Sequence, residues 1–429
     1  MPHRRGIPNR TRRNWLRMVG TAGIIGIAGC SSSEENEPDE GTGTDDSTGT
    51  DDSTGTDDST GTDDGTGTDE EDGSSASFAI PMFRYNAANT GTSPNATGPQ
   101  NSISEQWVFQ TGDGVESSPV VVDGTVYIGS NDGSVYALSA DDGAEQWAFQ
   151  TSGSVQSSPA VIDSTVYVGS RDGSVYALSA DDGTEQWAFE TGTAVSSSPA
   201  VVNDTVYIGS SNSVRNDKNV HALSADDGTE RWGFETRGKS TVASSPAVVD
   251  GTVYVGDIEA TMYALSADDG AEQWNFQQSS EAAPAVTNDT VYFPGLDGNV
   301  YALSADDGSE QWAFDTYGPL RSSAAAVGGT VYTGNWDGIV YAMSADDGTE
   351  LWASETEANW VSSPVVVDDT VYIGGIDQES GILYGMSADD GTEQWAFQTS
   401  GHIVSSPAVI DNTVYVGSRD GNVYALSEE

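Results

Sequence analysis

The sequence predicts an all-β protein, an eight-bladed β-propeller of four-stranded blades whose ring is closed by an N-terminal strand. The first observation behind this prediction is a set of tryptophans that recur at steps of 38 to 45 residues. A period of this length indicates one supersecondary unit copied many times. The recurring tryptophans are Trp107, Trp147, Trp187, Trp232, Trp274, Trp312, Trp352 and Trp395.

The second observation is the strand pattern inside each repeat. Residues 125–128 and 134–138 are β-branched or aromatic runs separated by Asn131-Asp132-Gly133, which is a hairpin signal. Residues 118–122 precede them as a third run, and a fourth run carries Trp147. Four short antiparallel strands per repeat are typical of a propeller blade, whereas a β-solenoid usually has shorter rungs.

The third observation is that the two ends of the array are complementary. Seven complete repeats run from residue 117 to residue 397, and residues 405–426 supply only three strands of an eighth. Residues 105–109, around Trp107, form a fourth strand that lacks its first three. We expect this strand to complete the last blade, because closure removes the exposed edges of an open array.

Residues 1–30 are predicted to be an export and anchoring signal. Residues 11–17 resemble a twin-arginine motif, and the apolar run 18–29 is too short to span a bilayer as a helix. Residues 27–30 are similar to a lipobox, in which Cys30 would be lipidated, and Cys30 is the only cysteine of the chain. This predicts a protein anchored by lipid on the extracellular face of the cell membrane. The alternative is a plain secretory signal with an incidental cysteine.

Two further segments precede the propeller, which is predicted over residues 107–429. Residues 31–76 contain 17 acidic residues and no basic ones in a Thr/Gly/Asp/Ser repeat, so we expect a disordered acidic tether. Its hydroxyl content would also suit O-glycosylation. Residues 77–106 are expected to form a lead-in of extended structure packed on the main body.

Residues 137–147 resemble the tryptophan-docking motif of the pyrroloquinoline-quinone-like propeller repeat. The Ala, Gly and Trp of that motif are present, but Ser139 replaces an Asp and Asp142 replaces a Thr. The resemblance covers residues 107–429 and implies that the eight tryptophans are structural and pack against a neighbouring blade. A resemblance to WD40 repeats is weaker, because no Gly-His pair recurs.

The resemblance implies two classes of protein. One is the scaffold lipoprotein of outer-membrane protein assembly, and the other is the quinone-dependent alcohol dehydrogenases. For the dehydrogenase class, the resemblance implies a longer chain with extra loops that hold a quinone and a calcium ion, and in many members a vicinal disulfide. The present chain has a single cysteine and cannot form that disulfide. We therefore predict a non-catalytic binding or scaffold module without cofactor, with the quinone-dependent dehydrogenase as the alternative.

Other chemical signals do not assemble into a catalytic or metal site. Residues 233–240 spell a Walker A loop, but a propeller strand follows where a phosphate-binding loop needs a helix. His221 stands where other repeats have Tyr, and His402 has no His or Cys at metal spacing. The Asp-Asp-Gly turns lack the alternating oxygen donors of a calcium loop.

The charge of the chain predicts its environment. The sequence has 67 acidic and 15 basic residues, and the part after residue 76 alone holds 50 and 9, a net charge of −41. Molar salt shortens the Debye length to about 3 Å and screens such repulsion. We therefore expect a protein of a halophilic archaeon, and the lack of a basic patch argues against nucleic acid as a partner.

Variation among the repeats indicates where a partner would bind. The position before each Ser-Ser-Pro should form a ring at the channel mouth, and Trp360 is expected in the core at the position of Val115. An unknown protein or small molecule is the expected partner of a monomeric propeller. The predicted ring contains Glu116, Gln156, Ser196, Ala243, Glu281, Arg321, Val361 and Val404. The predicted partner face contains Tyr317, Arg321, Asn335, Trp336 and Asn359.

Overall fold

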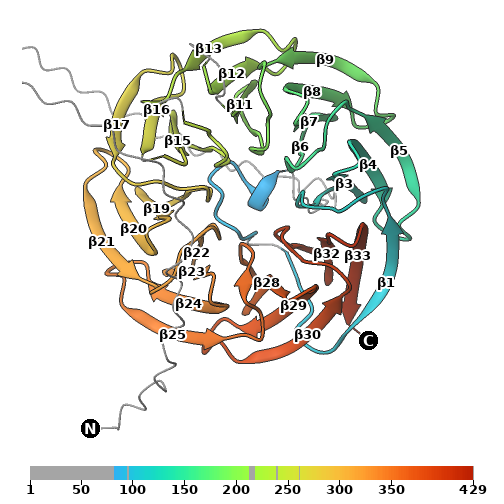
Figure 1. Ribbon diagram of the computed structural model, residues 1–429, viewed down its shortest axis with the longest axis vertical. Helices are drawn as coiled ribbons and strands as arrows, with labels where there is room; N and C mark the ends of the chain where they lie inside the picture. Colours follow the sequence, from blue (N-terminus) through green and yellow to red (C-terminus); the bar gives the residue numbers. More distant parts are fainter. Residues whose placement is uncertain (1–81, 94–95, 212–217, 238–239, 260, 429) are drawn as a thin grey trace, which may run out of the picture. The chain divides into compact units, whose positions relative to one another are not determined.

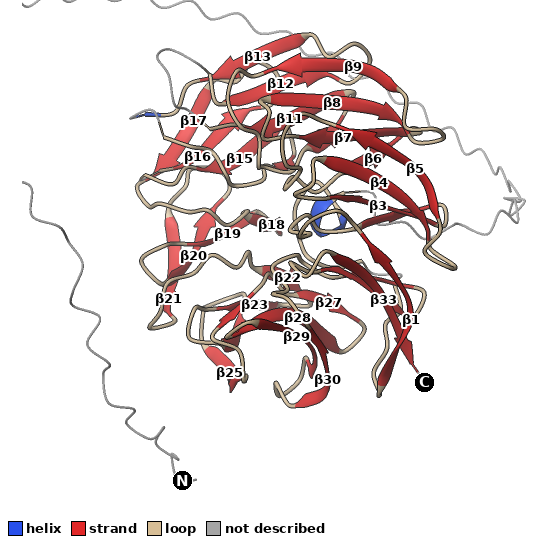
Figure 2. Cartoon of the chain, turned by 45° about the vertical axis from the view of Figure 1, so that its right-hand side comes forward, coloured by secondary structure: helices blue, strands red, loops and turns tan. Residues whose placement is uncertain are grey.

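The protein is an eight-bladed β-propeller, as the repeats predict. A computed structural model describes residues 82–93, 96–211, 218–237, 240–259 and 261–428. Eight antiparallel sheets stand in a ring around a central axis, and almost every regular element is a strand (Figures 1 and 2). The predicted signal, Cys30 and the acidic tether lie outside the described residues. Within the described ranges, no helix is both long and apolar enough to cross a membrane.

Four strands follow one another from the channel outward in the first four blades. Blade 1 contains β2 (Val120–Val122), β3 (Thr125–Gly129), β4 (Ser134–Ser139) and β5 (Glu145–Gln150). Blade 2 contains β6 (Ala160–Ile162), β7 (Thr165–Gly169), β8 (Ser174–Ser179) and β9 (Glu185–Glu190). Blade 3 contains β10 (Ala200–Val202), β11 (Thr205–Gly209), β12 (Val220–Ser224) and β13 (Glu230–Phe234). Blade 4 contains β14 (Ala247–Val249), β15 (Thr252–Gly256), β16 (Met262–Ser266) and β17 (Glu272–Phe276).

The other four blades repeat this order with two exceptions, an extra inner strand in blade 7 and a distant outer strand in blade 8. Blade 5 contains β18 (Ala285–Thr287), β19 (Thr290–Pro294), β20 (Asn299–Ser304) and β21 (Glu310–Asp315). Blade 6 contains β22 (Ala325–Val327), β23 (Thr330–Gly334), β24 (Ile339–Ser344) and β25 (Glu350–Glu355). Blade 7 contains β26 (Trp360–Val361), β27 (Val365–Val367), β28 (Thr370–Asp377), β29 (Ser380–Ser387) and β30 (Glu393–Thr399). Blade 8 contains β31 (Ala408–Ile410), β32 (Thr413–Gly417), β33 (Asn422–Glu428) and β1 (Ile103–Gln110).

The N-terminal strand closes the ring. Strand β1 pairs antiparallel with β33, with Trp107 opposite Ala425, and the two strands lie side by side in Figure 1. A register shift at Glu105/Trp107 matches the shift at Ala137/Leu138 in blade 1. Strand β1 therefore has the geometry of an ordinary fourth strand, although it precedes all the others in sequence.

Each docking tryptophan fastens its blade to the next one. The indole Nε1–H of Trp147, for example, donates to the carbonyl oxygen of Ala180 at 2.8 Å, and its ring lies 5.9 Å from that of Tyr127. The Asp-Asp-Gly turn that follows the accepting alanine has its glycine against the indole. Gly183 has φ +70°, and a Cβ there would lie 2.6 Å from Cε3 of Trp147, so this turn requires glycine.

The two serines of each Ser-Ser-Pro segment have different structural roles. The first accepts from a backbone N–H within its own blade, as Ser157 does from Gly169 at 3.0 Å. The second accepts from the preceding blade, as Ser158 does from the N–H of Ser118 at 2.9 Å. Among the described residues six such bonds between blades run around the channel, including one from Ser406 to Ser118 across the closure.

The lead-in segment lies along the inner ends of the blades. A short 3₁₀ helix η1 (Phe83–Tyr85) stands at the centre of the ring, where the blue segment crosses in Figure 1. Carbonyl groups of the lead-in then accept backbone N–H groups of the innermost strands of blades 4 to 7. These bonds join Ala87 to Val248, Ala88 to Val286, Thr90 to Ala326 and Gly91 to Val366 at 2.7 to 2.9 Å.

The end of the lead-in replaces a turn that the last blade lacks. In blade 8 the third strand β33 and the fourth strand β1 are distant in the sequence, so no Asp-Asp-Gly turn joins them to receive the tryptophan of blade 7. The carbonyl oxygen of Pro99 takes this place, and it accepts from Trp395 Nε1 at 3.2 Å and from the Tyr372 hydroxyl at 2.9 Å. Seven tryptophans therefore dock on an alanine carbonyl, and the eighth docks on the lead-in.

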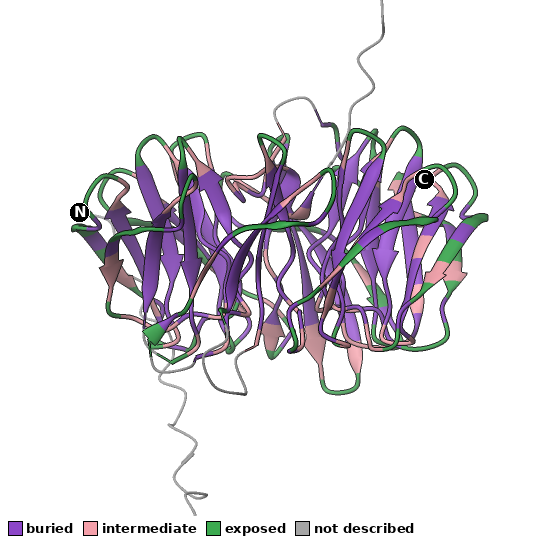
Figure 3. Cartoon of the chain, turned by 90° about the horizontal axis from the view of Figure 1, so that it is seen from above, coloured by how far each residue is buried: buried purple, intermediate pink, exposed green. Residues whose placement is uncertain are grey.

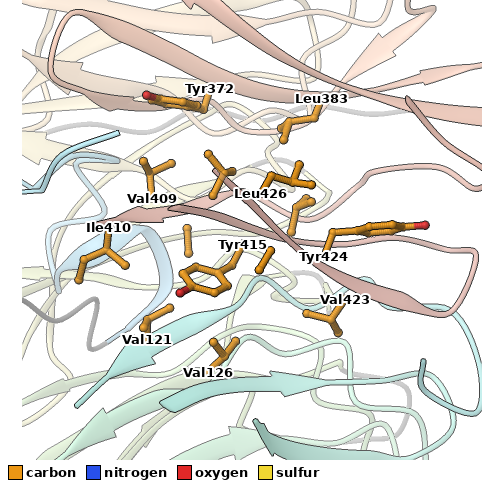
Figure 4. Packing of buried hydrophobic residues seen from close by; sticks show 14 of the residues in the cluster. Val121, Val126, Tyr372, Leu383, Val409, Ile410, Tyr415, Val423, Tyr424 and Leu426 are labelled. Atoms are coloured by element: carbon orange, nitrogen blue, oxygen red, sulfur yellow. The ribbon is translucent and has the colours of Figure 1, made fainter. Parts of the chain in front are cut away.

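The hydrophobic core is divided among the interfaces between blades. Around the closure, buried side chains of the first, seventh and eighth blades pack together, with Tyr415, Val409 and Leu426 at the centre (Figure 4). In blade 1 the second strand is buried throughout, whereas Trp147 is the only buried residue of the outer strand. Exposed positions lie in the loops at the two faces of the ring and along the outer strands at its rim (Figure 3).

Removing the closing strand should destabilise the ring. A chain that starts at residue 111 loses β1 and the burial of Trp107, so we expect aggregation or a loss of several kcal/mol of unfolding free energy. A chain that starts at residue 101 keeps β1 but loses the lead-in, and a chain that starts at residue 82 serves as the control. In thermal melts the chain that starts at residue 111 should have the lowest midpoint, the chain that starts at 101 an intermediate one and the chain that starts at 82 the highest. Equal midpoints for the starts at 82 and 111 would contradict closure by β1.

Candidate functional site

A polar cavity of about 170 Å³ lies on the axis of the ring. Two rings of side chains line it, and Phe83 of the lead-in lines it as well. The outer ring surrounds the mouth and contains Glu116, Gln156, Ser196, Ala243, Glu281, Arg321 and Val404. The inner ring contains Ser118, Ser158, Ser198, Ser245, Ala283, Ser323, Ser363 and Ser406, most of which form the bonds between blades described above.

The lead-in occupies the other end of the channel. The Tyr85 hydroxyl donates to the carbonyl of Val409 at 3.0 Å and accepts from its N–H at 2.9 Å. The guanidinium of Arg84 donates to the carbonyls of Ala324 and Asn89, at 2.6 and 3.2 Å. Desolvation by burial lowers the pKa of Arg84 to about 9, so the side chain stays protonated at neutral pH. The lead-in therefore closes this end of the channel, and the cavity opens at the mouth.

One side of the mouth carries a network of polar side chains. The Glu116 carboxylate forms an ion pair with Arg419, with Nε 3.1 Å from Oε1. It also accepts hydrogen bonds from the side-chain amides of Asn131 and Gln156, each at 3.1 Å. Gln156 in turn accepts from Arg171 at 3.1 Å. Asn131, Arg171 and Arg419 occupy the same position in the hairpins of three successive blades around the ring, so one repeat position supplies the outer half of this network.

A second group lies across the mouth on blades 5 and 6. Arg321 Nη1 lies 2.9 Å from Glu281 Oε2, and its guanidinium carbon lies 4.8 Å from the centre of the Trp336 ring. A cation over an indole is attractive, with a strength of about 0.5 to 1 kcal/mol at exposed sites. The backbone N–H of Trp336 donates to the carbonyl of Pro319 at 3.2 Å, which joins the hairpin to the neighbouring loop.

The structure brings together part of the predicted partner face. Tyr317 is 85 % exposed and Trp336 is 42 % exposed, and both lie with Arg321 on the face that contains the mouth. Asn359 is exposed on the connection into blade 7. Asn335 is fully buried, so it is not a surface residue as the sequence suggested. Its amide donates to the carbonyl of Thr316 at 3.0 Å and its oxygen accepts from the N–H of Ile339 at 3.0 Å.

Blade 7 also departs from the predicted alignment of the ring. Val361 rather than Trp360 is fully buried and packs against Gly334, as Val155 packs against Gly129 in blade 1. Trp360 is only partly buried and pairs with Ile376 in the short strand β26. The prediction of Trp360 as a core residue was therefore wrong, because the chain is shifted by one residue here. Val361 correspondingly does not line the cavity.

His221 is a packing residue in the structure. Its ring meets Phe189 at 5.6 Å in an edge-on contact, and the tyrosines at this position of other blades meet their phenylalanines in the same way. Burial lowers the pKa of His221, against the opposing effect of Glu230 at 3.2 Å. Among the described residues, no group of three His, Cys, Asp or Glu side chains is placed to hold a metal ion.

The family model described as outer membrane protein assembly factor BamB matches residues 96–232, 216–338 and 336–429. These segments together cover the whole propeller. The chain belongs to the BamB family. No curated protein matches the sequence significantly.

Solved structures share the fold of this BamB-family propeller at low sequence identity. BamB from Moraxella catarrhalis is 18% identical with a TM-score of 0.64, covering 76% of this chain and 98% of that one. Quinohemoprotein alcohol dehydrogenase from Comamonas testosteroni is 16% identical with a TM-score of 0.69, covering 82% and 81%. A europium-containing methanol dehydrogenase is 15% identical with a TM-score of 0.70, covering 82% and 98%. Both scaffold and enzyme therefore occur on this fold.

The residues of this BamB-family channel do not fit a quinone cofactor. Cofactor pockets usually measure about 300 to 1,000 Å³, and the cavity here is smaller because the lead-in fills one end. Its wall is built of serines that already bond neighbouring blades, and Phe83 is its only aromatic lining residue among those described. The single cysteine of the sequence also excludes a vicinal disulfide.

Proposed function

We propose that this BamB-family propeller is a non-catalytic, lipid-anchored scaffold that presents its channel-mouth face to a partner outside the cell. We define this mouth face as the loops that join successive blades together with the hairpins between the second and third strands. The observation that carries the proposal is that otherwise similar repeats differ most there. Neighbouring blades place a charged network, exposed aromatics or small residues around one opening.

The distribution of cations supports the choice of this face. Five of the seven basic residues that the structure describes lie in mouth-face loops, although the chain is strongly acidic. The opposite face carries the Asp-Asp-Gly turns of seven blades. Arginine and aromatic side chains are enriched among residues that dominate binding energies. The mouth-face cations are Arg171, Lys218, Arg237, Arg321 and Arg419.

Affinity capture from native membranes in molar salt tests the proposed scaffold role. Trp336→Ala should lose the captured partner, because it removes an exposed aromatic side chain of the mouth face. Leu351→Ala is the matched control, since Leu351 is 55 % exposed on the outer strand β25. Identical sets of captured molecules with both variants would contradict a partner site on this face.

The lipid anchor is tested by changing the only cysteine. Cys30→Ser should release the protein into the medium, because the thiol is required for lipidation and the lipid is the proposed membrane anchor. Fractionation in high salt followed by immunodetection measures the release. A variant that stays with the membrane would show that a bound partner, rather than a lipid, holds the protein there.

The enzyme alternative deserves a direct test, because dehydrogenases share the fold. Addition of pyrroloquinoline quinone and calcium to the purified protein should produce no bound quinone spectrum after gel filtration. It should also produce no alcohol-dependent reduction of an artificial electron acceptor. Retention of one quinone per chain would contradict the conclusion that the channel residues do not fit a quinone, and would favour the dehydrogenase.

A further inference from the structure

Blade 6 differs from its neighbours in the bonding of one hairpin aspartate. In blade 1 the carboxylate of Asp132 accepts three hydrogen bonds, from the N–H of Ser134 at 2.8 Å, the N–H of Gly112 at 2.7 Å and the hydroxyl of Tyr136 at 2.8 Å. Asp172 and Asp420 accept the same three bonds in blades 2 and 8. The aspartate at this position is therefore normally a structural residue of the turn.

In blade 6 all three donors have other acceptors. The N–H of Ile339 donates to Asn335 Oδ1 at 3.0 Å, and the N–H of Tyr317 donates to Asp315 at 2.7 Å. The hydroxyl of Tyr341 donates to the carbonyl of Thr316 at 2.9 Å. The carboxylate of the equivalent aspartate, Asp337, is exposed and accepts no hydrogen bond from the described residues. Replacement of the usual serine by Asn335 thus frees a carboxylate on the mouth face.

Tyr317 lies in the loop beside this carboxylate and has an unusual conformation. Its φ is +59°, in the left-handed region that disfavours bulky side chains. The equivalent residue in the loop that leaves blade 2 is Gly192, with φ +77°, so another copy of this loop adopts the same conformation with glycine. A tyrosine that is 85 % exposed gains little from burial here. Strain of this kind is typical of functional sites.

The charges of this region leave a negative excess. Arg321 is paired with Glu281 and lies against the indole of Trp336, so its charge is already matched. Asp315 and Asp337 have no cationic partner within 4 Å among the described residues. Two exposed aromatic rings therefore stand beside two unmatched carboxylates, an arrangement complementary to a cation attached to a flat or apolar group.

We propose that Tyr317, Trp336 and Asp337, here called the blade-6 patch, bind an arginine or lysine side chain of a basic polypeptide segment. The cation pairs with the Asp337 carboxylate, and its aliphatic stem or guanidinium plane packs on the rings of Tyr317 and Trp336. This inference rests on the proposed scaffold function and gives its partner a chemical class. The internal repeats supply the comparison, since no other described hairpin combines a freed aspartate with exposed aromatics.

The test uses a capped Gly-Arg-Gly peptide and its neutral citrulline analogue in molar potassium chloride, where general attraction to the acidic surface is screened. The indole N–H resonance of Trp336, assigned by its loss in Trp336→Phe, reports binding at this place alone. The arginine peptide should shift this resonance and the citrulline peptide should not. Asp337→Asn should weaken binding about tenfold, the loss expected for a charge-assisted hydrogen bond.

Two further variants separate binding from folding. Asp346→Asn removes the same charge from the same blade at its opposite face and should leave the affinity unchanged. Tyr317→Gly introduces the residue of the equivalent loop that leaves blade 2, so it should keep or raise the melting temperature while weakening binding. Equal binding of both peptides, or an unchanged affinity in Asp337→Asn, would overturn the inference. If Trp336→Ala still abolished partner capture, the scaffold proposal would stand without it.

Discussion

The hydrogen bond from each indole to the following blade is the interaction on which the ring depends. A buried indole N–H needs an acceptor, and seven of the eight blades obtain it from an alanine carbonyl that the next blade supplies. The exception is Trp395 of blade 7, because blade 8 has no Asp-Asp-Gly turn beside this indole. The carbonyl oxygen of Pro99 accepts the hydrogen bond from Trp395 instead, so the lead-in is part of the propeller rather than a linker in front of it.

The sequence was sufficient for the fold because the repeats are regular and their two ends are complementary. The count of blades and the pairing of β1 with β33 follow from that regularity. The place of Pro99 could not be predicted, because the lead-in does not repeat and its bonds are made by backbone carbonyls, which any residue carries. The one-residue shift at Val361 could not be predicted either, because Trp360 and Val361 are both apolar and either could fill the core position.

The candidate site could also be predicted from the sequence only in part. Exposure of Tyr317 and Trp336 follows from their places in loops of the mouth face. The burial of Asn335 does not follow, because a polar residue in a hairpin is usually solvated. Its side chain instead replaces an aspartate as the acceptor in the turn. Comparison of hydrogen bonds between copies of one repeat was needed to recognise this exchange, and sequence letters alone do not record it.

The pairing of the first strand with the last has a consequence for how the chain is made. Strand β1 is synthesised before every strand of blades 1 to 7, whereas its partner β33 follows all of them in the sequence. The last blade therefore cannot be completed until all the other blades have been synthesised, and until it pairs with β1 the strand β33 has an exposed outer edge. Because β1 of a second molecule has the same shape, two unfinished rings can exchange this strand and form a domain-swapped dimer. Pairing of β1 with β33 of the same chain therefore competes with exchange of β1 between two chains.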